Sequence, residues 1–136
     1  MNEQIGASQR SAGRGLGRGA NLNVPLPEGA GDDVWLDAVA QLCEKLAAWG
    51  PDAVVVSLGV DAAADDPESP LRVSVDGYRR TGALVQQLGV PVVAVHEGGY
   101  HLPTLGELTV AALAGLVDSP PNRLLTDQSV KSEDGS

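Results

Sequence analysis

The sequence has few of the features that mark secreted or membrane proteins. It contains a single cysteine, Cys43, which excludes an internal disulfide and fits a reducing compartment. No apolar run reaches the length of a membrane span, and the N-terminus lacks the apolar segment of an export signal. We therefore expect a cytoplasmic protein without a membrane partner.

Basic residues are scarce as well. Nine lysines and arginines stand against 18 aspartates and glutamates, and the net charge is −9 at pH 7. A chain of this sign repels the phosphate backbone, so we expect no nucleic-acid partner. An acidic surface suits a cationic substrate, but many proteins are acidic for solubility alone, so charge by itself identifies no substrate.

The chain is long enough for one domain between two polar ends. Its 136 residues begin and finish with stretches rich in Ser, Pro, Asn and Gln, at 1–12 and 118–136. Such stretches cannot bury enough apolar surface to offset the entropy of ordering. We predict disorder at both ends and a partial α/β domain at residues 13–117.

Apolar periodicity predicts helices that alternate with strands. The expected order is helix, strand, helix, strand, helix, at residues 32–49, 53–59, 74–88, 91–95 and 105–117. Asp32 or Asp33 is expected to cap the first helix, with Cys43 on its apolar face, and Ser74 to cap the second. The last helix is apolar nearly all round, so we expect it to be well covered.

Both predicted strands are β-branched runs without alternation, a pattern typical of strands buried on both faces of a parallel sheet. Residues 22–24 could add a short third strand. Natural sheets average about five or six strands, and a parallel pair under three helices leaves open edges. We therefore expect an incomplete α/β sheet that docks on another sheet or forms one part of a larger domain.

Polar residues follow both strands, at the ends where ligands bind in open α/β sheets. The first strand runs into the acidic stretch "DAAADDPE", which begins at Asp61, and the second runs into Gly98, Gly99 and Tyr100. Carboxylates this close together are either well solvated or hold a cation. Taken singly, Asp61 is better explained as a solvated loop acid, whereas Tyr100 fits packing and a site role equally well. As a pair on matched strand ends, they form a candidate site.

The glycine-rich stretch "GRGLGRGA", residues 13–20, meets a loose dinucleotide-binding fingerprint. We reject that interpretation, because no predicted strand precedes the stretch and "NLNVPLP" follows where a helix would begin. Its arginines also resemble an RNA-binding arginine–glycine segment. In so acidic a chain, a flexible loop is favoured.

Three stretches resemble the histone deacetylase superfamily in their order and spacing. They are "GRGANLNVPLP" at 17–27, "VVVSLGVDAAADDP" at 54–67 and "VHEGGYHLPTLGE" at 95–107. The resemblance is closest to the bacterial acetylpolyamine amidohydrolase and acetoin-utilisation-type branch. It implies the arginase-like α/β fold and zinc-dependent hydrolysis of acetyl-lysine or acetylpolyamine-type amides.

The resemblance also implies roles for residues at the strand ends. Asp61 stands where the family has its last zinc ligand, and Tyr100 where it has the tyrosine that donates to the scissile carbonyl and its oxyanion. Gly98 and Gly99 match the substrate-channel loop that carries this tyrosine. Asp66 matches a loop acid with a supporting, structural role.

Other functional residues of the family are missing from this sequence. The family takes further zinc ligands from an Asp-x-His motif and its general base from a His-His pair. The chain has only His96 and His101, and neither fits either motif. Catalytic zinc takes three protein ligands, so one carboxylate cannot hold it.

Two functions therefore stay open. The first is the C-terminal portion of a zinc-dependent deacetylase, inactive and without zinc unless the missing half is supplied. The second is a non-catalytic α/β remnant or interaction module, with self-association through its exposed sheet edge.

Overall fold

Helices and strands alternate along the folded part of the chain. The computed structural model describes residues 15–118. The elements are η1 (Gly15–Gly17), α2 (Asp32–Trp49), β1 (Val54–Leu58), α3 (Val75–Gln86), β2 (Val92–His96) and α4 (Leu102–Asp118). The order predicted from the sequence is confirmed. Of the disorder predicted for 1–12 and 118–136, only Asp118 lies within the described residues, where it ends α4 and is therefore ordered. The rest lies outside them, and the domain limits stay predictions.

The sheet consists of β1 and β2, which pair in parallel with α3 in the crossover connection. Val54 lies opposite Val92, and Leu58 lies opposite His96. Since the register holds to the last residue of each strand, both strands run into their following loops at the same end of the sheet. Within residues 15–118 the expected third strand at 22–24 does not form.

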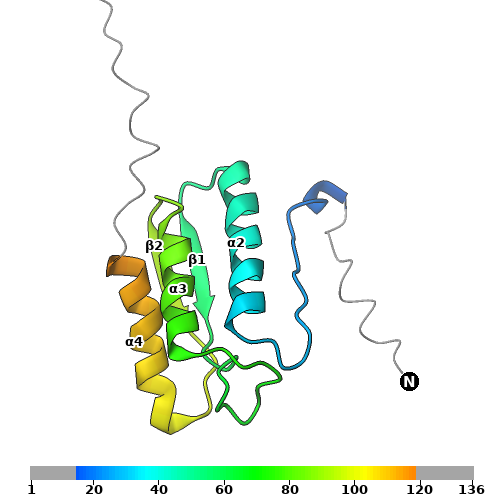
Figure 1. Cartoon of the computed structure of the whole chain (residues 1–136). Helices are drawn as coiled ribbons and strands as arrows, with labels where there is room; N and C mark the ends of the chain where they lie inside the picture. The colour runs from blue at the N-terminus through cyan, green and yellow to red at the C-terminus, as the bar shows by residue number, and fades with distance from the viewer. Residues whose placement is uncertain (1–14, 119–136) are drawn as a thin grey trace, which may run out of the picture.

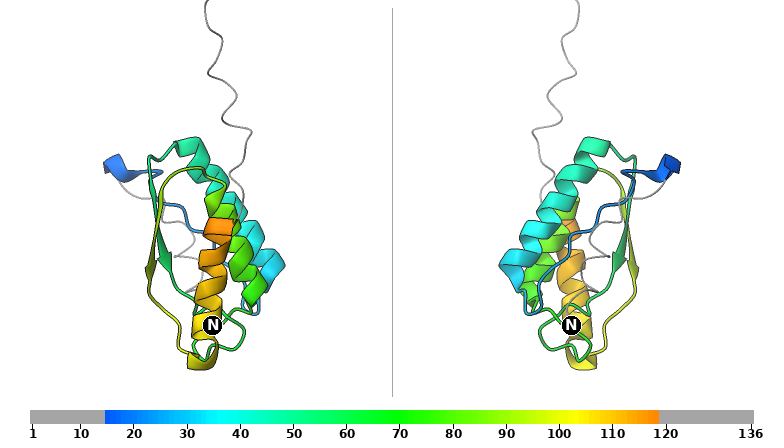
Figure 2. Two further views of the ribbon diagram at one scale, coloured as in Figure 1. Left: turned by 90° about the vertical axis from the view of Figure 1, so that its left-hand side faces the viewer. Right: turned by 90° about the vertical axis from the view of Figure 1, so that its right-hand side faces the viewer.

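The helices α2, α3 and α4 all lie on one face of this sheet (Figures 1 and 2). Leu58 and Val60 contribute to the core beneath them, together with Tyr78 of α3. On the opposite face Val55 and Val93 are 70% and 59% exposed. The prediction that both strands are buried on both faces is therefore wrong for the described residues. Parallel sheets are nearly always covered on both sides, so this bare face is unusual.

The start of α2 differs from the prediction. Its N-cap is Gly31, which makes no side-chain cap, and Asp32 is the first helical residue. The Asp32 carboxylate instead accepts hydrogen bonds from the Ser74 amide, at 2.8 Å, and from the Ser74 hydroxyl. Ser74 caps α3 as predicted, because its hydroxyl accepts from the Gly77 amide at 3.1 Å. Asp32 thus joins the starts of two helices.

Cys43, which the sequence places on the apolar face of this helix, is half-buried on α2. Burial raises the pKa of its thiol above the ordinary value. The thiolate is the reactive form of cysteine, so this shift disfavours reactivity at neutral pH. Cys43 therefore serves in packing.

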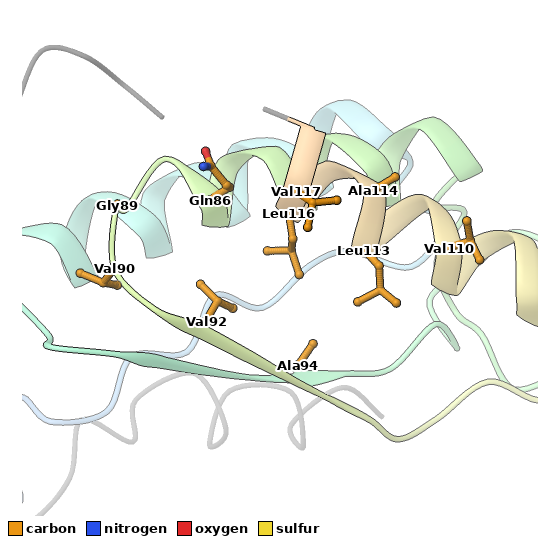
Figure 3. A pocket seen from close by; sticks show the side chains of 10 residues that line it. All are labelled: Gln86, Gly89, Val90, Val92, Ala94, Val110, Leu113, Ala114, Leu116 and Val117. Carbon is orange, nitrogen blue, oxygen red and sulfur yellow. The ribbon is translucent and has the colours of Figure 1, made fainter. Parts of the chain in front are cut away.

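The helix α4 begins at Leu102, earlier than predicted, and it is not covered on all sides. Val110 and Val117 are exposed, in contrast to the sequence-based expectation. A groove of about 870 Å³ lies between this helix and β2, with Val92 and Leu113 among its lining residues (Figure 3). Together with the bare sheet face, the groove leaves apolar surface uncovered in the part of the chain that is described.

The helices α3 and α4 pack closely because glycines lie at their contact. A Cβ atom at Gly115 would collide with the carbonyl oxygen of Arg79, and one at Gly82 with the carbonyl oxygen of Ala112. The obstructing atoms belong to backbone, which cannot move aside as a flexible side chain can. These glycines therefore allow α4 to pack closely against α3.

We predict that Gly115→Ala lowers the free energy of unfolding by about 1–3 kcal/mol, because the added methyl forces the helices apart. Urea titration monitored by tryptophan fluorescence measures the change. The matched control is Gly106→Ala on the same helix, where a Cβ atom would have no neighbour within 4 Å. Since alanine favours helix over glycine, this control is expected to be neutral or stabilising. Equal effects of the two substitutions would contradict close packing at Gly115.

Candidate functional site

Two loops leave the sheet side by side at the carboxyl ends of its strands. We call residues 59–68 the acidic loop and residues 97–101 the tyrosine loop. The Glu97 amide donates to the carbonyl of Leu58 at 3.0 Å, and the Val60 amide donates to the carbonyl of Gly98 at 2.8 Å. The parallel pairing therefore continues beyond both strands and holds the two loops together.

The Asp61 carboxylate lies against the backbone of both loops. A Cβ atom at Gly59 would be 2.8 Å from Oδ1 of Asp61, and one at Gly98 would collide with Oδ2. A side chain at position 98 would therefore displace the carboxylate. The structure thus brings Asp61 next to the glycine pair, as strand ends on one edge require.

Gly99 sets the course of the chain immediately before Tyr100. Its φ of 148° is one that residues with a side chain rarely adopt. A Cβ atom here would also lie 2.7 Å from Cγ2 of Val60 and 2.6 Å from Cδ1 of Leu105. Both the backbone conformation and the packing therefore require glycine.

Asp66 is the one buried acid of the described residues, with 7% of its surface exposed. Its Oδ2 accepts from the amides of Tyr100, at 2.7 Å, and His101, at 3.3 Å. Its Oδ1 accepts from the Glu68 amide at 2.9 Å, which closes a local turn in the acidic loop. Burial alone would raise the pKa of this carboxyl, but the three amide donors and the nearby His101 hold it below its ordinary value.

The Tyr100 side chain projects from this anchored backbone and is 58% exposed. Among residues 15–118, no group hydrogen-bonds its hydroxyl. An exposed ring with an unoccupied hydroxyl does not fit a packing role in this part of the chain. Its role as a donor stays a prediction.

Sequence reasoning missed the role of Tyr78. This buried residue of α3 accepts a hydrogen bond from the Ala62 amide on its hydroxyl, at 3.1 Å, and its ring lies 6.2 Å from that of Trp35. Burial raises the pKa of Tyr78 well above the usual range, so the hydroxyl stays neutral. Tyr78 thereby supports the acidic loop directly after Asp61. Helical spacing in the sequence places Tyr78 on α3. Nothing in the sequence indicates that its hydroxyl contacts the Ala62 amide.

The described residues do not fit a complete metal site. Asp65 and Glu68 are exposed, and no group of three His, Cys, Asp or Glu side chains could hold a metal ion anywhere in 15–118. The Nδ1 atom of His101 is 2.8 Å from the Thr104 hydroxyl. Catalytic zinc takes three protein ligands. Asp61 could supply one of them, but the other described residues cannot supply the remaining two.

The glycine-rich stretch does not form a nucleotide-binding turn. Gly15–Gly17 makes one short 3-10 helix, and residues 20–27 continue without a helix. In the described range, the helix that a dinucleotide-binding turn requires does not follow the stretch. The segment where its strand would precede lies outside the described residues.

Comparison with known proteins identifies the family. Residues 5–116 match the histone deacetylase domain. The chain belongs to the histone deacetylase family. It is 41% identical over 103 residues to acetylpolyamine amidohydrolase 1 of Pseudomonas aeruginosa, covering 76% of this chain and 30% of that protein. It is 42% identical over 97 residues to acetylpolyamine amidohydrolase of Burkholderia pseudomallei, covering 71% of this chain and 28% of that protein.

A solved deacetylase-family structure has the same fold. Acetylpolyamine aminohydrolase from Burkholderia pseudomallei superposes with a TM-score of 0.76 at 37% identity, over 79% of this chain and 31% of that one. The predictions of the family and of a deacetylase-like α/β fold are therefore confirmed. The chain spans less than a third of the length of these relatives.

The hydrogen bonds from the Tyr100 and His101 amides to the Asp66 carboxylate hold the tyrosine loop, and we call them the Asp66 anchor. We predict that this anchor is lost in acid. Since the folded-state pKa lies below the ordinary value of 3.8, the anchor is complete above about pH 4 and is lost as the pH falls through the lower value. Between about pH 5 and pH 2, the free energy of unfolding of the parent should therefore fall more steeply than that of Asp66→Asn. Urea titrations across this range measure both slopes. The control Asp65→Asn removes an exposed carboxyl from the same loop. If Asp65→Asn and Asp66→Asn change the slope of unfolding free energy against pH equally, the acid response comes from overall charge and the prediction is wrong.

Proposed function

We propose that the chain contributes to a zinc-dependent amide hydrolase that removes acetyl groups from acetylated amines. The observation that carries the proposal is the meeting of Asp61 with the tyrosine loop at the carboxyl ends of β1 and β2. These are the positions at which open α/β sheets bind ligands. Membership of the histone deacetylase family supports the reaction class.

In this proposal Asp61 supplies one ligand of a zinc centre. Its carboxylate is held at the strand ends by the backbone of Gly59 and Gly98. The remaining ligands and the general base would come from residues that supply an Asp-x-His motif and a His-His pair, which this sequence does not contain. The chain alone is then inactive and needs a complementary portion of a deacetylase domain.

Tyr100 would supply a hydrogen-bond donor to the amide as negative charge develops on its oxygen. The exposed side chain and the free hydroxyl in the described structure support this role. A donor that is held in place before the reaction stabilises the oxyanion without the cost of reorganising water. The tyrosine loop gives such a donor a fixed backbone position.

The substrate class that we favour is an acetylated polyamine or an acetylated lysine side chain. Two relatives with about 40% identity are named acetylpolyamine amidohydrolases. A net charge of −9 also attracts cationic amines. These observations support the substrate class and leave the individual amine open.

The bare sheet face favours a second candidate, a non-catalytic module that binds through its sheet. Val55, Val93 and Val95 are exposed on this face, and β2 has a free edge in the described part of the chain. Such an edge can pair with another strand, including that of a second copy. Light scattering distinguishes the two: self-association of the chain that Val93→Lys abolishes, without any deacetylation in a complemented assembly, would favour the module.

We predict that the purified chain retains no stoichiometric zinc and has no deacetylase activity. A single carboxylate at the strand ends binds zinc no better than other surface acids. Dialysis against a mild chelator followed by elemental analysis measures the metal content. One zinc ion per chain after this treatment would contradict the proposed ligand set.

We predict that Tyr100→Phe in a complemented assembly lowers kcat about 100- to 1,000-fold with little change in KM, because only the donor is removed. The assembly combines this chain with a polypeptide that carries the Asp-x-His and His-His motifs, and steady-state deacetylation of an acetylated polyamine gives both constants.

Asp61→Asn is expected to lower zinc content, so that added zinc restores part of its activity. Turnover of Tyr100→Phe within a few-fold of the parent, with unchanged zinc in Asp61→Asn, would contradict the assignment of this site.

A further inference from the structure

We propose that Asp66 is a positioning residue for Tyr100, and that its carboxylate fixes the tyrosine loop relative to Asp61. The effect on catalysis rests on the proposed function of Tyr100. The anchor itself rests only on the geometry of the described residues.

The first support is the environment of the Asp66 carboxylate. A buried carboxylate is costly unless hydrogen bonds replace its water. Of its three amide donors, that of Glu68 belongs to the acidic loop, whereas those of Tyr100 and His101 come from the other loop. The acidic loop could close its own turn without the second pair. Two of the three hydrogen bonds to the Asp66 carboxylate therefore hold the tyrosine loop.

The second support is that the tyrosine loop is attached on both sides of Gly99. Before it, the carbonyl of Gly98 accepts from the Val60 amide, and the Asp61 carboxylate packs against Gly98. After it, the Tyr100 amide donates to Asp66. The space that a side chain at Gly99 would need is filled by Val60 and Leu105. The backbone of Tyr100 cannot shift relative to Asp61 without breaking one of these attachments.

The third support is the contrast between the backbone and the side chain of Tyr100. The backbone is anchored, whereas the ring is exposed and its hydroxyl has no hydrogen-bond partner in the described part of the chain. The position of the hydroxyl therefore depends on the backbone and on two side-chain torsions. Catalytic groups act only when held to within about 0.5 Å of the productive geometry. Asp66 provides that precision without contact with the substrate.

Amide hydrogen exchange tests the anchor without any need for activity. We expect Asp66→Ala to speed the exchange of the Tyr100 and His101 amides at least about tenfold. Asp66→Asn keeps one neutral acceptor oxygen and should give a smaller increase. The Glu97 amide, which donates to Leu58, should stay within about twofold of the parent.

The matched control is Asp65→Asn, which changes an exposed neighbour and should leave all three amides unaffected. Unchanged exchange at Tyr100 in both Asp66 variants would overturn the anchor. So would an equal increase at Glu97, because it would indicate general loosening of the fold. If Asp66→Ala does not fold, Asp66→Asn decides the test.

The positioning role is tested by kinetics in the complemented assembly. We expect Asp66→Asn to lower kcat about tenfold with little change in KM, and to have less than about a twofold effect when Tyr100→Phe is already present. The same factor in both backgrounds would overturn the proposal, since Asp66 would then act independently of the Tyr100 hydroxyl. If Tyr100→Phe alone leaves kcat unchanged, the proposed function fails, whereas the exchange measurement still judges the anchor.

Discussion

The candidate site depends on one constraint, the parallel register of β1 and β2. Leu58 lies opposite His96, so both strands end at the same level and release their loops at one edge of the sheet. The pairing continues through the Val60 amide and the Gly98 carbonyl. A slip of one residue would turn the side chains of a strand to the other face and separate the loops. The positions of Asp61 and Tyr100 both follow from this register.

The acids that follow β1 have different surroundings, and these separate their roles. Asp61 packs against glycine backbone at the strand ends, and Asp66 is buried beneath three amide donors. Asp65 and Glu68 are exposed and remain solvated. An acidic loop of this kind therefore is not a single cation site. Its carboxylates divide between a candidate ligand position, an anchor for the neighbouring loop, and the protein surface.

Much of the fold could be predicted from the sequence because its signals are local. The β-branched runs gave both strands, and Ser74 indicated the start of α3. The cap of α2 was wrong because Asp32 bonds to Ser74, a partner distant in sequence. The Tyr100 and His101 donors to Asp66 and the contact of the Tyr78 hydroxyl with the Ala62 amide were not predictable for the same reason. The bare face at Val55 also escaped prediction, since a buried-strand pattern describes what a strand requires and not what covers it.

In the proposed function, Asp61 is one ligand of a zinc centre completed by residues outside this sequence. Anomalous diffraction at the zinc edge, from crystals of the complemented assembly, tests it most directly. We expect one zinc ion at a distance of about 2.0–2.2 Å from a carboxylate oxygen of Asp61. A zinc ion bound elsewhere, with Asp61 facing only solvent and glycine backbone, would contradict the claim.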